Sequence, residues 1–157
     1  MKILSIDSGV EKTGYAVFEN NTYLTSGLIK TDKSLSLPER LSMIHRFLEQ
    51  IINKHHPEVI ILEQIFFFRN KKTIVSVSQS QGVILFLASQ KKIRVEYLTP
   101  LQIKQAITGY GRADKKSLQK MLSFQGNIAL EKKDDDETDA IACALAYYYL
   151  HQNEFFH

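Results

Sequence analysis

Residues 59–62 limit the possible folds more than any other part of the sequence, because they are four consecutive aliphatic residues, Val-Ile-Ile-Leu. An unbroken run of this kind is typical of a strand that is buried on both faces, whereas a strand with one solvent-exposed face alternates apolar and polar residues. A sheet with such a strand at its centre needs a layer of helices to cover it. The sequence therefore predicts an α/β protein.

The spacing of apolar residues predicts the other elements around this run. Short apolar segments predict strands, and the i, i+3, i+7 spacing of Leu41, Ile44 and Leu48 predicts a helix. Strands are expected at 2–7, 14–18, 22–29, 59–62 and 93–98, and helices at about 38–56, 72–89, 100–107, 114–124 and 136–151. The first three strands follow tight turns and should be antiparallel, and helical crossovers lead to the others. This order predicts a mixed five-stranded sheet with helices packed on it.

Length and composition fit a single domain over residues 1–157, with 44% hydrophobic and 24% charged residues. No apolar run approaches the roughly 20 residues of a membrane-spanning helix, so we expect no membrane contact. Asp7 interrupts the first apolar run too early for an export signal, and the single cysteine, Cys143, forms no internal disulfide. These features predict a cytoplasmic protein. Residues 154–157 are expected to be frayed.

Charge is divided into opposed blocks, although the net charge is only +3. Every charged residue in 69–94 is basic, and the only acid in 104–120 is Asp114. Residues 131–139 reverse the sign, with six acids against two lysines. A basic surface beside a dense acidic cluster favours a protein that holds a polyanion near bound cations.

Four carboxylates are candidates for such a site. Asp7 ends one predicted buried strand, and Glu63 ends another. A turn or a helix cap would explain either acid alone, but two such positions suggest a site, since open sheets bind ligands beyond strand ends. Asp136 and Asp139 are three residues apart on one face of the last predicted helix. The helix macrodipole favours acids at its N-terminus, which explains one or two of them but not the whole run.

Crowded carboxylates repel one another unless a cation lies among them. Mg²⁺ takes hard oxygen ligands, and two such ions roughly 3.5–4 Å apart can activate a water and stabilise the leaving oxygen in phosphodiester hydrolysis. The sequence lacks the motifs of zinc hydrolases, serine hydrolases and P-loop proteins. The acids therefore favour a magnesium-dependent nuclease.

Several segments, in order along the chain, resemble the motifs of the RuvC family of Holliday junction resolvases. They are Ile6-Asp7-Ser8-Gly9 with Thr13-Gly14-Tyr15, Leu62-Glu63-Gln64-Ile65-Phe66, the basic segments Ile103-Lys104-Gln105, Thr108-Gly109-Tyr110-Gly111 and Ala113-Asp114-Lys115, and Asp136-Glu137-Thr138-Asp139-Ala140-Ile141-Ala142. Any one of them is weakly specific, but together they extend over essentially the whole chain.

The resemblance implies a ribonuclease-H-like fold, with helices on both faces of the sheet, and a homodimer that binds four-way DNA junctions and nicks two strands of like polarity. The metal-binding catalytic acids would be Asp7, Glu63, Asp136 and Asp139, with two Mg²⁺ per site that Mn²⁺ can replace. Some members carry His where Asp136 stands, so Asp134 or Asp135 could complete the set instead. Whether a branch-migration motor complex is a partner stays open.

The resemblance also assigns contacts to DNA. Lys104 and Lys115 match catalytically important basic positions, which would neutralise phosphate near the scissile bond. Phe66 matches an aromatic residue that contacts bases, and stacking on an unpaired base contributes about 1–3 kcal/mol. Phe67 and Phe68 extend this aromatic run, in which at least one ring should be exposed while others belong to the core. The expected DNA contacts are Phe66, Phe67, Arg69, Lys72, Lys104, Arg112, Lys115 and Lys116.

The predicted helix 72–89 corresponds to the one through which these enzymes dimerise, although core packing explains its apolar residues equally well. Two other functions fit parts of the sequence: a related nuclease that processes structured RNA, and a junction-binding dimer without catalysis. The matches at Phe66, Lys104 and Lys115 argue against the first, and the intact acid set argues against the second. The prediction is a Mg²⁺-dependent endodeoxyribonuclease that resolves Holliday junctions.

Overall fold

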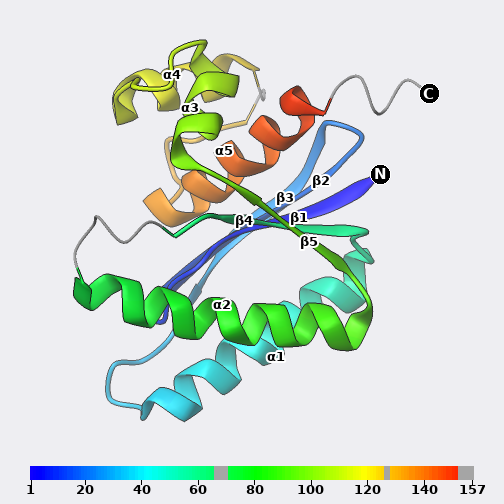
Figure 1. Ribbon diagram of the computed structural model, residues 1–157, viewed down its shortest axis with the longest axis vertical. Helices are drawn as coiled ribbons and strands as arrows, with labels where there is room; N and C mark the ends of the chain where they lie inside the picture. The colour runs from blue at the N-terminus through cyan, green and yellow to red at the C-terminus, as the bar shows by residue number, and fades with distance from the viewer. Residues whose placement is uncertain (66–70, 126–127, 152–157) are drawn as a thin grey trace.

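A mixed five-stranded sheet forms the centre of the computed structural model, which describes residues 1–65, 71–125 and 128–151 (Figure 1). The strands are β1 (Lys2–Asp7), β2 (Lys12–Glu19), β3 (Thr22–Lys30), β4 (Val59–Glu63) and β5 (Arg94–Leu98). The helices are α1 (Leu37–His55), α2 (Lys71–Lys91), α3 (Pro100–Thr108), α4 (Lys115–Gln125) and α5 (Asp135–Leu150). Residues 154–157, which were expected to be frayed, lie outside the described part.

The strand order is β3-β2-β1-β4-β5. β1, β2 and β3 pair antiparallel, whereas β4 pairs parallel to both β1 and β5. The first four residues of β4 are buried, so the predicted central strand and the mixed sheet are confirmed.

Alternation along the strands sends side chains into two cores, one on each face of the sheet. Leu4 and Ile6 of β1 pack in the core beneath α1 and α2. Ile3 of the same strand packs in the other core with α5. Figure 1 shows α1 and α2 on one face of the sheet and α3, α4 and α5 on the other, as the resemblance implied.

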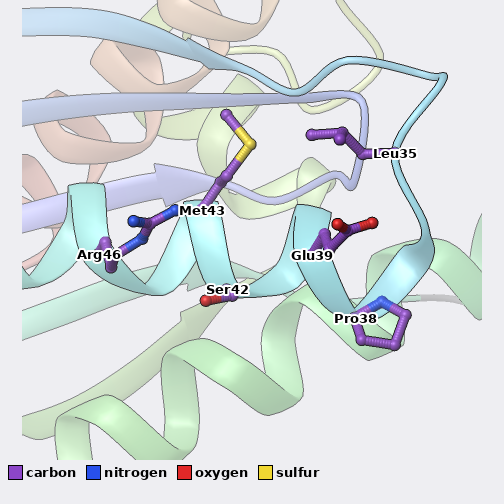
Figure 2. Close-up of a pocket in the computed structure, with 6 residues that line it drawn as sticks. All are labelled: Leu35, Pro38, Glu39, Ser42, Met43 and Arg46. Atoms are coloured by element: carbon purple, nitrogen blue, oxygen red, sulfur yellow. The ribbon is translucent and has the colours of Figure 1, made fainter.

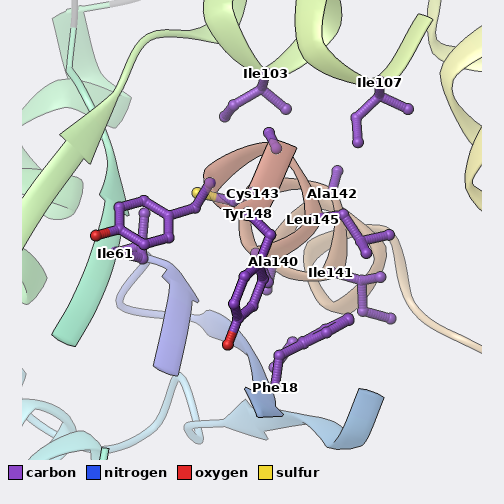
Figure 3. Close-up of a cluster of buried hydrophobic side chains, with 14 of the residues drawn as sticks. Phe18, Ile61, Ile103, Ile107, Ala140, Ile141, Ala142, Cys143, Leu145 and Tyr148 are labelled. Atoms are coloured by element: carbon purple, nitrogen blue, oxygen red, sulfur yellow. The ribbon is translucent and has the colours of Figure 1, made fainter. Parts of the chain in front are cut away.

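Helix α5 is buried on almost every side, with ten buried residues among its sixteen. Its alternating alanines, Ala140 and Ala142 among them, allow the helix to lie close against the sheet (Figure 3). The Ser5 hydroxyl of β1 donates to the Ala140 carbonyl oxygen at 2.5 Å. This contact fixes the height of α5 above β1.

Pro38 and Pro100 lie at helix starts, as predicted, and Pro57 lies between α1 and β4. Pro100 opens α3, where Thr99 and Gln102 cap each other with hydrogen bonds of 2.9 and 3.1 Å. Gly109 ends this helix in the left-handed conformation with φ 74°. The ends of the observed elements differ from the predicted ends by up to two residues in either direction, because apolar spacing locates a buried interior but not the polar ends. Within the three described ranges, no helix has the length and apolar content to span a membrane.

Candidate active site

Asp7 and Glu63 lie next to each other at the carboxyl ends of β1 and β4. The two strands are parallel with Ile6 opposite Leu62, so the residue after each reaches the same edge of the sheet. The alternation that directs Ile3 and Ile61 into the core beneath α5 also places both acids on that face. The strands thus deliver two carboxylates to one place beneath α5.

The first turn of α5 brings Asp136 and Asp139 to the same place. Gly14 of β2 lies opposite Asp7 in the sheet. A Cβ atom at Gly14 would lie 2.0 Å from the main-chain oxygen of Asp136, a distance that no side chain tolerates. Glycine at this position is therefore what allows α5 to begin directly above Asp7.

Polar contacts hold the start of α5 on β2 and β3. Asp134 is its N-cap and accepts from the Asp136 backbone N–H at 3.4 Å and from the Lys12 ammonium at 2.9 Å. Glu137 pairs with Lys133 at 2.7 Å, and both side chains are largely buried. Ser26 of β3 donates to Glu137 at 2.5 Å. These contacts commit Asp134 and Glu137 to holding the helix, and Asp136 beside them lies close enough to Asp7 to raise its pKa.

The electrostatics of Asp7 reflect this crowding. Its pKa is raised from 3.8 to about 8, chiefly by burial and then by the charges of Asp139, Asp136 and Glu63 and by a hydrogen bond with the Asp136 side chain. Burial likewise raises the pKa of Asp136 and of Asp139. The four acids therefore form one electrostatic group that cannot be fully ionised without a compensating positive charge.

The two predicted catalytic lysines lie beside this group. The Lys115 ammonium is 3.2 Å from an Asp135 carboxylate oxygen and 3.5 Å from one of Asp139. Lys104 lowers the pKa of Asp139 through its charge, although burial outweighs this effect. A hollow of about 310 Å³ is lined by Glu63, Asp139 and both lysines. Side chains from β4, α3, α4 and α5 thus meet around one opening.

Comparison with known proteins identifies the family. The family model of Crossover junction endodeoxyribonuclease RuvC matches residues 3–147. The chain belongs to this family. Proteins of that name from Fusobacterium nucleatum and Halothermothrix orenii are 37% and 40% identical to it over 151 residues. The match covers 94% of this chain in both cases, and 80% and 92% of the respective relatives. The predicted class of enzyme, an endodeoxyribonuclease of crossover junctions, is confirmed.

Solved structures confirm the fold. Thermus thermophilus RuvC in complex with a Holliday junction substrate aligns with a TM-score of 0.89 over 98% of this chain and 96% of that one, at 24% identity. The yeast mitochondrial Holliday junction resolvase Ydc2 aligns with a TM-score of 0.61 over 98% and 85%, at 15% identity. The predicted ribonuclease-H-like fold is therefore confirmed, and it is the fold of the solved RuvC structure.

RuvC nucleases are metal-dependent, and the four acids suit a hard divalent cation because they offer only carboxylate oxygens. Among the described residues, however, no three His, Cys, Asp or Glu side chains are already arranged to hold an ion. Asp136 lies close enough to Asp7 to raise its pKa, and Asp139 pairs with Lys115. The donor chemistry and the proximity fit a metal, and binding requires these side chains to exchange their present partners.

The predicted DNA contacts are described only in part. Phe66, Phe67, Phe68 and Arg69 lie outside the described residues, as does the side chain of Lys72 in α2. Arg112 and Lys116 are exposed. Arg112 lines a second hollow with Tyr110 and Lys120, on the side of α4 opposite the first.

A further hollow lies on α1, on the other face of the sheet from the acids (Figure 2). Its charged lining residues are Glu39 and Arg46. Glu39 accepts from the Ser36 backbone N–H at 2.8 Å and so belongs to the start of α1. This hollow brings together none of the predicted site residues among those described.

Two residues that contact this site were not predicted to do so. Gly14 was noted only as part of a motif, and Gln81 of α2, which hydrogen-bonds the main chain of Glu63, was not noted at all. A polar residue one turn before the apolar pair Ile84 and Leu87 was the available signal for Gln81. The closeness of Gly14 to α5 depends on a contact between distant segments and has no local signal.

Proposed function

We propose that this RuvC-family enzyme resolves four-way DNA junctions as a homodimer, using two Mg²⁺ ions held in each subunit by Asp7, Glu63, Asp136 and Asp139. The observation that carries the proposal is the convergence of these acids from β1, β4 and α5, with the pKa of Asp7 raised to about 8. Mn²⁺ is expected to replace Mg²⁺, since it accepts the same oxygen ligands.

The acids would bind the metal ions, and the lysines would neutralise the phosphate. When bound, the two ions would activate a water and stabilise the leaving oxygen of the phosphodiester. Asp7 lies between the acids of β4 and α5 and is the natural shared ligand. Lys104 and Lys115 line the same hollow as Glu63 and Asp139, where their charges would neutralise the phosphate. Lys115 would leave Asp139 as the cations and DNA enter.

The DNA would continue from this hollow across α4. Lys115 and Lys116 begin this helix, and Arg112 and Lys120 line the hollow on its other side. Asp114, the acid among them, accepts from the Ser117 backbone N–H at 2.7 Å as a helix cap. The exposed surface is thus predominantly positive, which suits a phosphate backbone. Phe66, Phe67, Arg69 and Lys72 remain proposed contacts at the crossover.

Helix α2 carries the surface proposed for dimerisation. Val75, Gln79, Gly82 and Phe86 are exposed at i, i+4, i+7 and i+11 and so form one stripe, with Val75 and Phe86 at 59% and 61% exposure. A Cβ atom at Gly82 would meet no described atom within 4 Å, so packing within the subunit does not explain a glycine there. A second α2 could approach closely at this point. Ile84 and Leu87, in contrast, belong to the core.

A relative of solved structure supports the proposed substrate. Thermus thermophilus RuvC, which shares this fold, was solved with a Holliday junction substrate, and we extend that substrate to this chain. A branch-migration motor complex is a further proposed partner.

Cleavage of synthetic four-way junctions tests the proposal. The wild-type protein with Mg²⁺ should nick an immobile and a mobile junction symmetrically, and should leave a structured RNA intact. Asp7→Asn should bind junctions as well as wild type, because it removes a negative charge near the phosphates, but should not cut them. Cleavage by this variant at the wild-type rate would show that the acid assignment is wrong.

A further inference from the structure

Gln81 is a buried polar residue on α2 that contacts the backbone of a proposed metal ligand. Its side chain is 6% exposed. The side-chain Nε2 donates to the main-chain oxygen of Glu63 at 3.0 Å. The buried residues that follow on this face, Ile84 and Leu87, are apolar. A buried amide requires a hydrogen-bond partner, and Gln81 finds one at the end of β4.

The peptide unit between Glu63 and Gln64 is held from both sides. Its N–H, on Gln64, donates to the Leu98 carbonyl oxygen of β5 at 2.8 Å. Its C=O, on Glu63, accepts from Gln81 of α2. Because the orientation of this peptide plane sets the backbone from which the Glu63 carboxylate projects, both contacts constrain where that carboxylate can reach. The N–H contact continues the sheet, whereas the C=O contact depends on one side chain of a helix.

We infer that Gln81 is a positioning residue for Glu63, an inference that rests on the proposed role of Glu63 in metal binding. Gln81 directly precedes Gly82, the centre of the exposed α2 stripe. The same helix turn therefore contacts the proposed partner subunit on one side and the end of β4 on the other. Through Gln81, the position of α2 therefore constrains the backbone of Glu63.

Gln81→Met tests the inference, since it keeps the length and bulk of the side chain but removes the donor. Changing a group that orients a metal ligand typically weakens metal affinity or activity 10–100-fold. We expect the Mg²⁺ concentration for half-maximal junction cleavage to rise about tenfold. Calorimetric titration of Mg²⁺ into the junction-bound protein should show an equal loss of affinity, with junction binding unchanged.

Ile84→Val is the matched control, because it weakens the same buried face of α2 without touching Glu63. It should lower the melting temperature and leave both Mg²⁺ measurements unchanged. An equal shift of Mg²⁺ affinity in Ile84→Val, or no shift in Gln81→Met, overturns the inference. If Gln81→Met does not fold, Gln81→Asn replaces it, since it shortens the side chain but keeps an amide in the core. A wild-type Mg²⁺ affinity in Gln81→Asn would likewise overturn the inference.

Glu63→Gln distinguishes a failure of the proposed metal-binding role of Glu63 from a failure of the positioning role of Gln81. If this variant cuts junctions at the wild-type rate, the proposed role of Glu63 is wrong, whatever Gln81 does. If it is inactive while Gln81→Met matches wild type in cleavage and in Mg²⁺ affinity, only the positioning role fails.

Discussion

Helices α5 and α2 lie on opposite faces of the same sheet and are used in opposite ways. α5 is buried on almost every side, and polar contacts from β1, β2 and β3 hold its first turns. α2 buries one face and leaves Val75 and Phe86 exposed. The helix that supplies two acids is thus immobilised within the subunit, whereas the helix that supplies none has an exposed apolar face, the one proposed for dimerisation.

Gly14→Ala should have the largest effect, because it disturbs the contact that seats α5. The new Cβ would lie 2.0 Å from the Asp136 main-chain oxygen, and overpacking of this severity costs about 3 kcal/mol of unfolding free energy. Displacing Asp136 by about 1 Å should also lower cleavage roughly 100-fold. Urea unfolding and junction cleavage measure the two effects. A stable and fully active variant would mean that α5 is not constrained at Gly14.

Phe86→Asp tests the open face of α2. A charge within the proposed helix pair should weaken the dimer by about 2 kcal/mol or more, roughly 30-fold in dissociation constant. Analytical ultracentrifugation measures this change. The unfolding of the dilute monomer should be unaffected, because Phe86 is 61% exposed within the subunit. An unchanged dimer would place the subunit contact on another surface.

The stability of the metal-free protein should depend on pH through Asp7. The folded-state pKa is about 8 against 3.8 when unfolded, so the folded state binds the proton more tightly. Stability from this group is therefore fully present below pH 3.8 and is lost as pH rises toward 8, by at most about 1.4 kcal/mol per pH unit. Urea unfolding in EDTA at pH 5, 6.5 and 8 measures the slope.

Asp7→Asn is the control for this titration, since the amide does not ionise. Its slope between pH 5 and 8 should be flatter than that of wild type. Equal slopes in the two proteins would assign the pH dependence to other groups.

Gly82→Ala should have the smallest effect and is the counterpart of Gly14→Ala. Since no described atom lies within 4 Å of the new Cβ, the monomer should gain up to about 1 kcal/mol in helix propensity. The dimer should weaken if the two α2 helices meet at this residue. Urea unfolding at low protein concentration measures the stability of the monomer, and ultracentrifugation measures the affinity of the dimer. A tighter dimer would contradict close helix approach at Gly82.

Much of the fold follows from local sequence, because its signals are short-range. The apolar run at 59–62 predicted β4, and Pro38 and Pro100 marked helix starts that the structure confirms. Asp7 and Glu63 were recognised as site candidates because each ends a buried strand. A residue that follows a strand in a parallel pair reaches the same sheet edge as its neighbour, whatever lies elsewhere in the chain.

Only the tertiary structure distinguishes the three consecutive acids at the start of α5. Asp134, Asp135 and Asp136 are chemically identical, but Asp134 caps the helix and pairs with Lys12, and Asp135 is exposed beside Lys115. Asp136 is the one of the three whose charge raises the pKa of Asp7, together with the charges of Asp139 and Glu63. The choice depends on the rotation of α5 over β1, which Gly14 of another strand permits.

The tertiary structure likewise determined which face of α2 is buried and which is exposed. Its sequence offered both core packing and a partner surface for its apolar residues, and the structure divides them, with Ile84 and Leu87 inside and Val75 and Phe86 outside. Gln81 acquires its partner only because α2 crosses the end of β4. Local sequence therefore determined which elements form and where the first two acids lie, whereas contacts between distant segments decided which other side chains lie around them.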